Sequence, residues 1–220
     1  MMNEVDFLLW VKGSAFNIAL FIFVAGLVLR LFEILSLGRK VNYAVPKGDP
    51  MQGGLREIFR RFGTDKATFQ RSMITIVAGY VFHIGLFVVI FLLAAHVEVF
   101  KSVLGFGWPN LSTPVVDAFA VVTMIALVVV LIHRLQHPVK RFLSSPGDYV
   151  AWAVTFVPLL TGYMAYHHLL LSPQMMLGLH ILSVEVLLIV FPFTKLMHTF
   201  TVFLSRWYNG ASMGLRGVKS

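Results

Sequence analysis

The chain has 220 residues, of which 58% are hydrophobic and only 13% are charged, and its formal net charge is +8. This composition excludes an ordinary soluble domain and is typical of a protein with several membrane-spanning segments. The positive charge is therefore expected in loops on one side of a bilayer, and not on a surface that binds nucleic acid. Because the chain has no cysteine, it cannot itself hold a thiolate-ligated iron–sulfur cluster, a covalently attached c-type haem or a disulfide.

Five apolar segments follow one another along the chain, each near or above the roughly 20 residues that a spanning helix needs. We expect them at about 16–35, 72–100, 115–135, 149–171 and 177–205. They predict an all-α integral membrane bundle of five transmembrane helices. The bundle is expected to be a single domain, residues 1–220, and to cross the cell inner (cytoplasmic) membrane several times.

Lysine and arginine are distributed unevenly between the loops, which predicts orientation because cytoplasmic loops carry the excess of these residues. The second-to-third loop offers only Lys101, and the fourth-to-fifth loop offers none. We therefore expect the N-terminus outside and the C-terminus in the cytoplasm. The basic residues on the side assigned to the cytoplasm are Arg39, Lys40, Lys47, Arg56, Arg60, Arg61, Lys66, Arg71, Arg134, Lys140, Arg141, Arg206, Arg216 and Lys219.

The first cytoplasmic loop contains an amphipathic stretch at about 53–64. Leu55, Ile58, Phe59 and Phe62 recur at helical spacing, with arginines on the other face. This pattern predicts a short helix in the headgroup layer, where it contacts membrane lipid as an anchor. A basic dock for a cytoplasmic redox subunit is the alternative, and the two roles are compatible.

Two histidines of the last segment, His180 and His198, are eighteen positions apart, which is five helical turns at about 3.6 residues per turn. Both imidazoles should then face the same side of one helix at opposite depths, and Pro192 between them predicts a kink. Histidines within a membrane are costly and usually mark a site. In the expected orientation, His83 of the second segment matches His198 in depth on the inner side, and His96 matches His180 on the outer side.

These four histidines predict two haems b, one near each membrane face. Two neutral imidazoles fill both axial positions of an iron, which then cycles by one electron. His83 with His198 would hold the inner haem iron, and His96 with His180 the outer one. On a straight helix, the thirteen positions from His83 to His96 leave the two rings roughly 140° apart, so a distortion of the second helix is expected. Histidines bonded to neighbouring helices are the alternative.

Four residues are candidates for a quinone site near the outer haem: Glu185, His167, His168 and Lys101. Glu185 lies just over one turn after His180, and a carboxylate within a membrane is a functional candidate by default. The simpler interpretation is that Glu185 is neutral and hydrogen-bonded. His167 or His168 could also replace His96 as a haem ligand, or lie at headgroup level.

The remaining polar residues near the inner ends of the segments have more than one interpretation. Arg30 and Glu33 are three positions apart and can pair with each other. His133 and His137 lie one turn apart in a basic setting and are expected to be interfacial, not ligands. The candidates for contact with haem propionates on the inner side are Arg30, Arg71, Arg134 and Lys195.

The segment from His180 through FPFTKLMH to His198 closely resembles the last helix of the membrane cytochrome b (gamma) subunit of respiratory nitrate reductases. The FHIG around His83 is similar to the start of the second helix in that family. The family implies a two-haem-b subunit that oxidises quinol near the outer face and sends electrons to a cytoplasmic iron–sulfur subunit. The resemblance carries over ligand roles for His180, His198 and His83. The second ligand of the second helix is expected at Leu93, and the available histidine, His96, is three positions further on. This spacing is more similar to gamma-like subunits of sulfur-metabolism and heterodisulfide-reductase-like complexes.

The predicted function is therefore electron transfer across the membrane between the quinone pool and a cytoplasmic iron–sulfur-containing oxidoreductase partner. The chain would be the quinone-reactive subunit of a multi-subunit oxidoreductase, and the direction of electron flow stays open. A proton-relay transporter or channel built on the histidines and Glu185 is one alternative, which the nearly apolar third segment disfavours. A cofactor-free membrane anchor of a peripheral enzyme is the other, and it leaves four histidines of the apolar segments unexplained.

Overall fold

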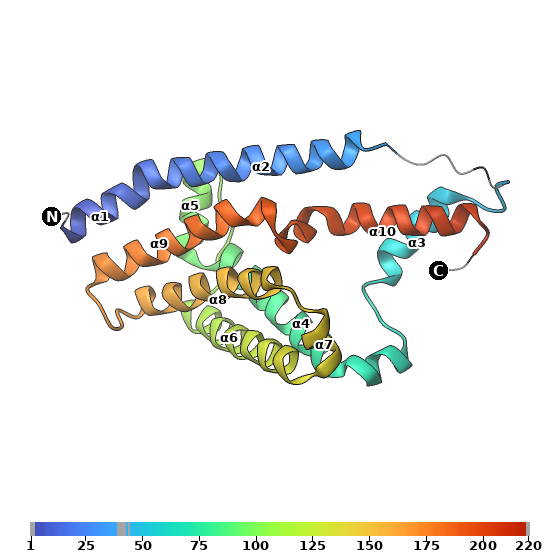
Figure 1. Ribbon diagram of the computed structural model, residues 1–220. Helices are drawn as coiled ribbons and strands as arrows, with labels where there is room; N and C mark the ends of the chain where they lie inside the picture. Colours follow the sequence, from blue (N-terminus) through green and yellow to red (C-terminus); the bar gives the residue numbers. More distant parts are fainter. Residues whose placement is uncertain (1–2, 39–42, 44, 219–220) are drawn as a thin grey trace. The chain divides into compact units, whose positions relative to one another are not determined.

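The computed structural model describes residues 3–38, 43 and 45–218, and all regular secondary structure in this part of the chain is helical (Figure 1). Five of the described helical stretches are long and apolar enough to cross a membrane: Glu4–Ser36, Lys66–Leu92, Thr113–Gln136, Pro146–Tyr166 and Pro173–Phe193. The prediction of an all-helical protein with five candidate spans is confirmed. The orientation stays a prediction, and Arg39, Lys40 and Lys219, which contribute to it, lie outside the described residues.

Two compact units make up the chain. The first unit comprises Met1–Phe21 and Ser72–Val190, and the second comprises Ile22–Arg71 and Phe191–Ser220. Each unit therefore combines two segments that are far apart in the sequence. The assignment of the chain to a single domain stays a prediction.

The first span begins earlier than expected, at Glu4 instead of near residue 16. Helix α1 (Glu4–Trp10) starts at a capping box, in which the Asn3 side chain accepts the Asp6 N–H at 2.7 Å. One π-helical stretch, η1 (Val11–Ala15), follows α1 directly and leads into α2 (Phe16–Ser36). The capping box supplies partners for backbone N–H groups that a helix start leaves unpaired, which explains the early start.

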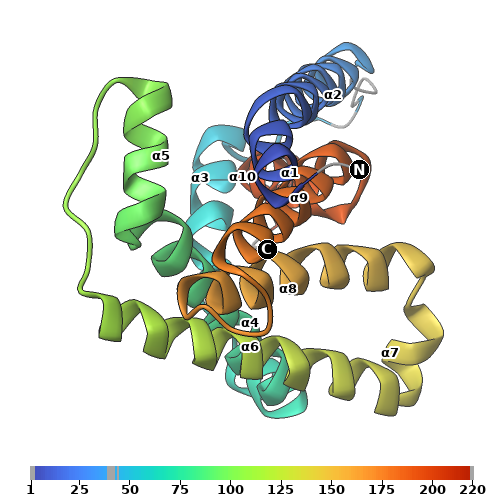
Figure 2. The same ribbon diagram turned by 90° about the vertical axis from the view of Figure 1, so that its left-hand side faces the viewer.

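The second span is not one helix over 72–100, as expected, because the helix breaks at Leu93. Helix α4 runs from Lys66 to Leu92, Leu93 is extended with φ −75° and ψ 129°, and α5 (Ala94–Leu104) starts in a new direction (Figure 2). Two later residues bond carbonyls at the end of α4. The indole N–H of Trp108 donates to the Phe91 carbonyl at 2.5 Å, and the Leu111 N–H donates to the Leu92 carbonyl at 2.9 Å.

The third and fourth spans pack together around apolar side chains. Helix α6 (Thr113–Gln136) agrees with the expected span, and the short α7 (Pro138–Leu143) connects it to α8 (Pro146–Tyr166). Each of these helices has a proline in its first turn, where the missing N–H costs nothing. The cluster at the centre comprises Ala120, Leu127 and Leu159, with Phe82, Leu86, Val89, Met124, Trp152, Phe156 and Tyr163 around it.

Helix α8 ends at Tyr166, so the expected span of 149–171 is too long at its C-terminal end. His168 and Leu170 have positive φ values of 54° and 70°, which a continuing right-handed helix cannot contain. His167 and His168 therefore lie after the helix, and not on it as a continuous span would have placed them.

The fifth span is also interrupted, and the expectation of one kinked helix over 177–205 is wrong. Helix α9 (Pro173–Val190) ends before two 3₁₀ turns, Phe191–Phe193 and Lys195–Met197, and α10 (His198–Leu215) begins at His198 itself. Pro192 has no N–H to continue α9, and the Thr194 side chain starts the second turn by accepting the Leu196 N–H at 3.4 Å. His180 and His198 are consequently not on one helix, and the count of five turns does not apply to them.

In the second unit, α3 (Pro50–Arg60) packs against α10 through glycines. A Cβ at Gly53 would overlap the Gly210 carbonyl, so the two backbones are in direct contact. Glu57 of α3 is fully buried on this side and pairs with Arg60 at 2.9 Å and with Arg61. The amphipathic stretch expected at 53–64 is thus helical only as far as Arg60. The face of this helix that contains its glycines packs against α10. The predicted apolar face stays exposed at Leu55, Phe59 and Phe62.

A buried contact between α4 and α6 gives the first prediction. A Cβ added at Gly85 would overlap the hydroxyl of Thr123, which is fully buried. We expect Gly85→Ala to destabilise the fold by about 1–3 kcal/mol, since it overpacks this contact. The midpoint of thermal unfolding in detergent should fall. Adding Thr123→Ala should recover part of the loss, and a double variant no more stable than Gly85→Ala would contradict the contact.

Candidate functional site

The outer pair of predicted ligands, His96 and His180, is brought together within the first unit. His96 lies near the start of α5 and His180 in α9, and their ring centroids are 6.2 Å apart with an angle of 20° between the planes. The break at Leu93 turns α5 away from the axis of α4, so His96 does not keep the direction that a straight helix would give it. A distortion of the second segment was expected from the spacing of His83 and His96, and the helix does break between them.

The distance between the two rings fits a single metal ion between them. Imidazole nitrogens lie about 2.0–2.1 Å from a bound metal, and the ring centre lies roughly 1 Å behind the nitrogen, so two axial imidazoles have centres about 6 Å apart. The observed separation of 6.2 Å matches this value. The near-parallel planes are compatible with two rings on opposite sides of one iron.

The four predicted ligands share a second feature, which is a hydrogen-bonding partner at Nδ1. For three of them the partner is a backbone carbonyl, which accepts the ring N–H, fixes the ring orientation and makes Nε2 the nitrogen able to bind a metal. The Nδ1 contacts are His83 with the Gly79 carbonyl at 2.7 Å, His96 with Val89 at 2.8 Å, His198 with Lys195 at 2.8 Å, and His180 with the Thr161 hydroxyl at 3.4 Å.

His180 lies against a glycine of the neighbouring helix. A Cβ at Gly162 of α8 would be 2.8 Å from the His180 Cε1 atom and 3.1 Å from its Nδ1 atom. Thr161 beside it also hydrogen-bonds the Ser183 hydroxyl at 3.0 Å, which ties α8 to α9. Sequence reasoning did not single out Gly162. No signal in the sequence distinguishes it, because α8 also contains Gly147 and three alanines.

The inner pair is divided between the two units. His83 belongs to the first unit and stacks on Phe82, with centroids 4.1 Å apart. His198 belongs to the second unit and is the first residue of α10. The pairing of His83 with His198 therefore stays a prediction.

The quinone-site candidates have different neighbours in the structure. His167 Nε2 lies 3.3 Å from a carboxylate oxygen of Asp117, and His168 is exposed. Lys101 on α5 pairs with Glu98 at 3.7 Å, and both side chains are largely exposed. Glu185 of α9, by contrast, is almost fully buried.

Two of the candidates for contact with haem propionates, Arg30 and Arg134, form hydrogen bonds and ion pairs within the protein. Arg30 pairs with Glu33 at 2.8 Å, as one of the two interpretations predicts, and donates to the Pro192 carbonyl at 3.2 Å. Arg134 donates to Ser144 at 3.0 Å and pairs with Asp148 at 3.4 Å. Lys195 begins the second 3₁₀ turn, and Arg71 is exposed at the start of α4.

His133 and His137 are also close, with ring centroids 5.5 Å apart in an edge-to-face arrangement. Among the described residues, no group of three or more histidine, cysteine, aspartate or glutamate side chains could hold a metal ion. A metal held by protein ligands alone is thus not indicated in this part of the chain. A haem iron requires only two side chains because the porphyrin supplies its other four ligands.

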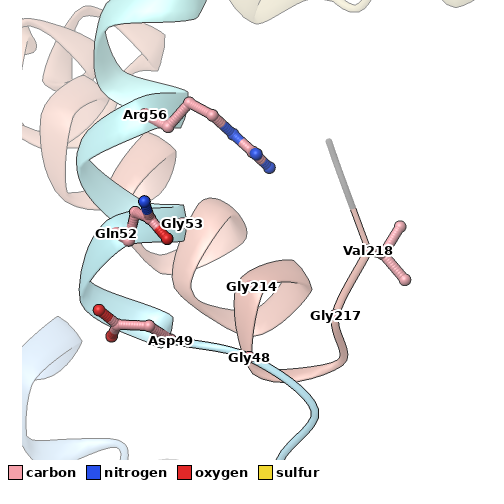
Figure 3. A pocket seen from close by; sticks show the side chains of 8 residues that line it. All are labelled: Gly48, Asp49, Gln52, Gly53, Arg56, Gly214, Gly217 and Val218. Carbon is pink, nitrogen blue, oxygen red and sulfur yellow. The ribbon is translucent and has the colours of Figure 1, made fainter.

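Two hollows lie in the second unit, and neither is lined by a histidine. The first, of about 140 Å³, lies where α3 begins and α10 ends, and Figure 3 shows the residues that line it: Gly48, Asp49, Gln52, Gly53, Arg56, Gly214, Gly217 and Val218. Asp49 already caps α3 there by accepting the Met51 N–H at 2.8 Å. The second, of about 410 Å³, is lined by Arg60, Arg61, Gly63, Thr64, Asp65 and Arg206. Hydrogen bonds from Thr68 lower the pKa of Asp65, so its carboxylate partly balances these arginines.

Comparison with known proteins gives one relative along nearly the whole chain. A curated protein of Nitratidesulfovibrio vulgaris, described simply as "Protein", is 29% identical over 215 residues, which cover 94% of this chain and 93% of that protein. No family model matches the chain. No solved structure matches it either.

The approach of α5 to α9 can be tested by cross-linking, because the chain has no cysteine of its own. The 6.2 Å between the rings of His96 and His180 predicts that a His96→Cys, His180→Cys double variant is joined by a short bifunctional thiol reagent. Mass spectrometry should recover the joined peptides, and either single variant serves as the control. Labelling of both thiols without any joined peptide would show that the two residues are not neighbours.

Proposed function

We propose that this protein is a dihaem b-type cytochrome subunit that transfers electrons across a membrane between the quinone pool and a cytoplasmic iron–sulfur-containing oxidoreductase. One observation carries the proposal, namely the 6.2 Å between the rings of His96 and His180 on two different helices. The Nδ1 contact of His96 with the Val89 carbonyl supports it, since a carbonyl can only accept and the Nε2 atom of that ring is then the one able to bind a metal.

Bound haem would supply one-electron redox chemistry. The chain's own residues do the rest. His96 and His180 would hold the outer iron, while the Val89 carbonyl and the Thr161 hydroxyl orient their rings. Apolar side chains of α4, α6 and α8 exclude water from the region between these helices.

The inner site would use His83 and His198, on the strength of their Nδ1 contacts and the resemblance of their sequence surroundings to the nitrate reductase gamma family. In the orientation predicted from the loops, this site lies on the cytoplasmic side. The basic residues of that side suit a cytoplasmic partner subunit, which must supply the iron–sulfur clusters because this chain has no cysteine.

The alternative of a proton-relay transporter has less support. A relay across the membrane needs polar groups along its whole path, and the span Thr113–Gln136 is nearly apolar. A cofactor-free anchor gives no reason for two histidines of different helices to meet at this distance.

Substitution of the ligands tests the proposal directly. His96→Ala and His180→Ala should each remove one haem b, the same one, because a single imidazole no longer completes the axial pair. His83→Ala and His198→Ala should each remove the other. Reduced-minus-oxidised spectra and pyridine haemochrome assays measure the loss, with His137→Ala as the control that keeps both haems. Four histidine variants with unchanged haem content would refute these ligands.

Gly162 gives a more selective prediction for the outer site. Gly162→Val should displace the His180 ring, since even a Cβ there lies 2.8 Å from it. We expect at least a large loss of the outer haem, with the inner haem retained. Gly147→Val is a useful control, because a Cβ at Gly147 near the other end of α8 meets only the Ser145 hydroxyl, at 3.7 Å. Equal haem content in both variants would show that Gly162 does not position His180.

A further inference from the structure

Glu185 has no evident structural role in the fold. It lies within the span Pro173–Phe193 and is only 2% exposed. Its Oε1 atom is buried without a hydrogen-bonding partner among the described residues. Buried polar atoms almost always have a partner, so an exception of this kind calls for an explanation in function.

The side chain lies on the side of α9 that packs against the N-terminal helices. Glu185 is seven positions after Gly178, which places the two on one face of the helix. A Cβ at Gly178 would be 2.6 Å from the Phe7 ring of α1, and α9 also contacts the π-helical η1. A π-helical turn inside an α-helix is uncommon and frequently marks a functional position. His180, in contrast, lies against Gly162 of α8.

No charged group bonds Glu185 from the elements packed against α9. On α1, Glu4 accepts a hydrogen bond from Ser172 and Asp6 takes part in the capping box. Lys12 of η1 is exposed, and Asp148 near the start of α8 pairs with Arg134. The titratable tyrosines of α8 are Tyr149, Tyr163 and Tyr166, and His180 is the titratable neighbour on α9 itself.

The charge state of Glu185 must therefore depend on something other than a salt bridge. An unpaired carboxylate in an apolar interior is very costly, and it becomes tolerable only when positive charge is near. An oxidised haem iron between two neutral imidazoles has a positive charge that is lost on reduction. His180 is five positions before Glu185, which is about 7.5 Å along the helix axis and roughly 140° around it. The outer iron would therefore lie across α9 from the carboxylate, and the two charges would interact through the apolar interior without direct contact.

We propose that Glu185 is the proton-binding group coupled to the outer haem, and that its carboxylate takes up one proton when that haem gains one electron. The proposal rests on the function proposed above. The electron comes from the redox partner that reduces the outer haem, and the proton comes from bulk water and forms one O–H bond on the carboxylate. When the electron moves on, the O–H bond breaks and the proton returns to water. Charge within the apolar interior is thereby kept nearly constant.

Redox titration of the outer haem at a series of pH values tests the coupling. His83→Ala, which is expected to lack the inner haem, leaves only the outer one to titrate. In this background the midpoint potential should fall as pH rises, because reduction takes up a proton. Adding Glu185→Gln should abolish this dependence. Adding Glu98→Gln, which removes an exposed carboxylate on α5, should leave it intact.

Infrared difference spectroscopy gives a second measurement, which does not depend on enzymatic activity and can be made on the native protein. The reduced-minus-oxidised spectrum should contain the C=O band of a newly protonated carboxyl group, shifted in D₂O and absent from Glu185→Gln. Haems present with a pH-independent potential and no such band would overturn this inference and leave the cytochrome intact. A native protein without haem would overturn the proposed function itself.

Discussion

The last carbonyl groups of a helix have no partner within it, and this constraint governs how α4 ends. In a membrane an unpaired carbonyl costs several kcal/mol, so the chain that follows must supply donors. Three residues do so here: His96 bonds the Val89 carbonyl, Trp108 bonds Phe91 and Leu111 bonds Leu92. The hydrogen bond that helps to complete the end of α4 also fixes the His96 ring. The end of α4 and the position of the His96 ring therefore depend on the same hydrogen bond.

Two buried glutamates, Glu57 and Glu185, differ in whether their carboxylates have partners. Glu57 is fully buried between α3 and α10, and Arg60 and Arg61 neutralise its charge. It stabilises a contact between backbones that glycines bring together, and removing it would leave the arginines unpaired. Glu185 is buried to nearly the same degree, yet one of its oxygens has no partner. Glu57 thus has a role in packing, whereas the packing of the described residues gives no role to Glu185.

Much of the fold follows from the sequence, because long apolar runs can only be helices that span a membrane or lie buried. The third span was predicted within two residues of its observed ends, Thr113 and Gln136. The spacing of His83 and His96 predicted a distortion of the second helix. Its position at Leu93 could not be predicted, since the run LLAAH contains no proline or glycine and two of the three donors, Trp108 and Leu111, lie far along the chain. Pro192 did signal the interruption of the fifth span, but the full break also required the turn that Thr194 begins.

The candidate site was predicted in part. Their expected depths in the membrane predicted that His96 and His180 are partners, and the structure places their rings 6.2 Å apart. The contact of His180 with Gly162 and the hydrogen bonds at the Nδ1 atoms depend on how the helices pack together, which the sequence of one segment does not show.

The most direct test of the central claim is electron paramagnetic resonance of the purified, oxidised protein with haem and protein quantified together. The account predicts two low-spin ferric signals typical of bis-histidine ligation and about two haems b per chain. A folded protein without haem, or one whose haem is high-spin, would contradict it.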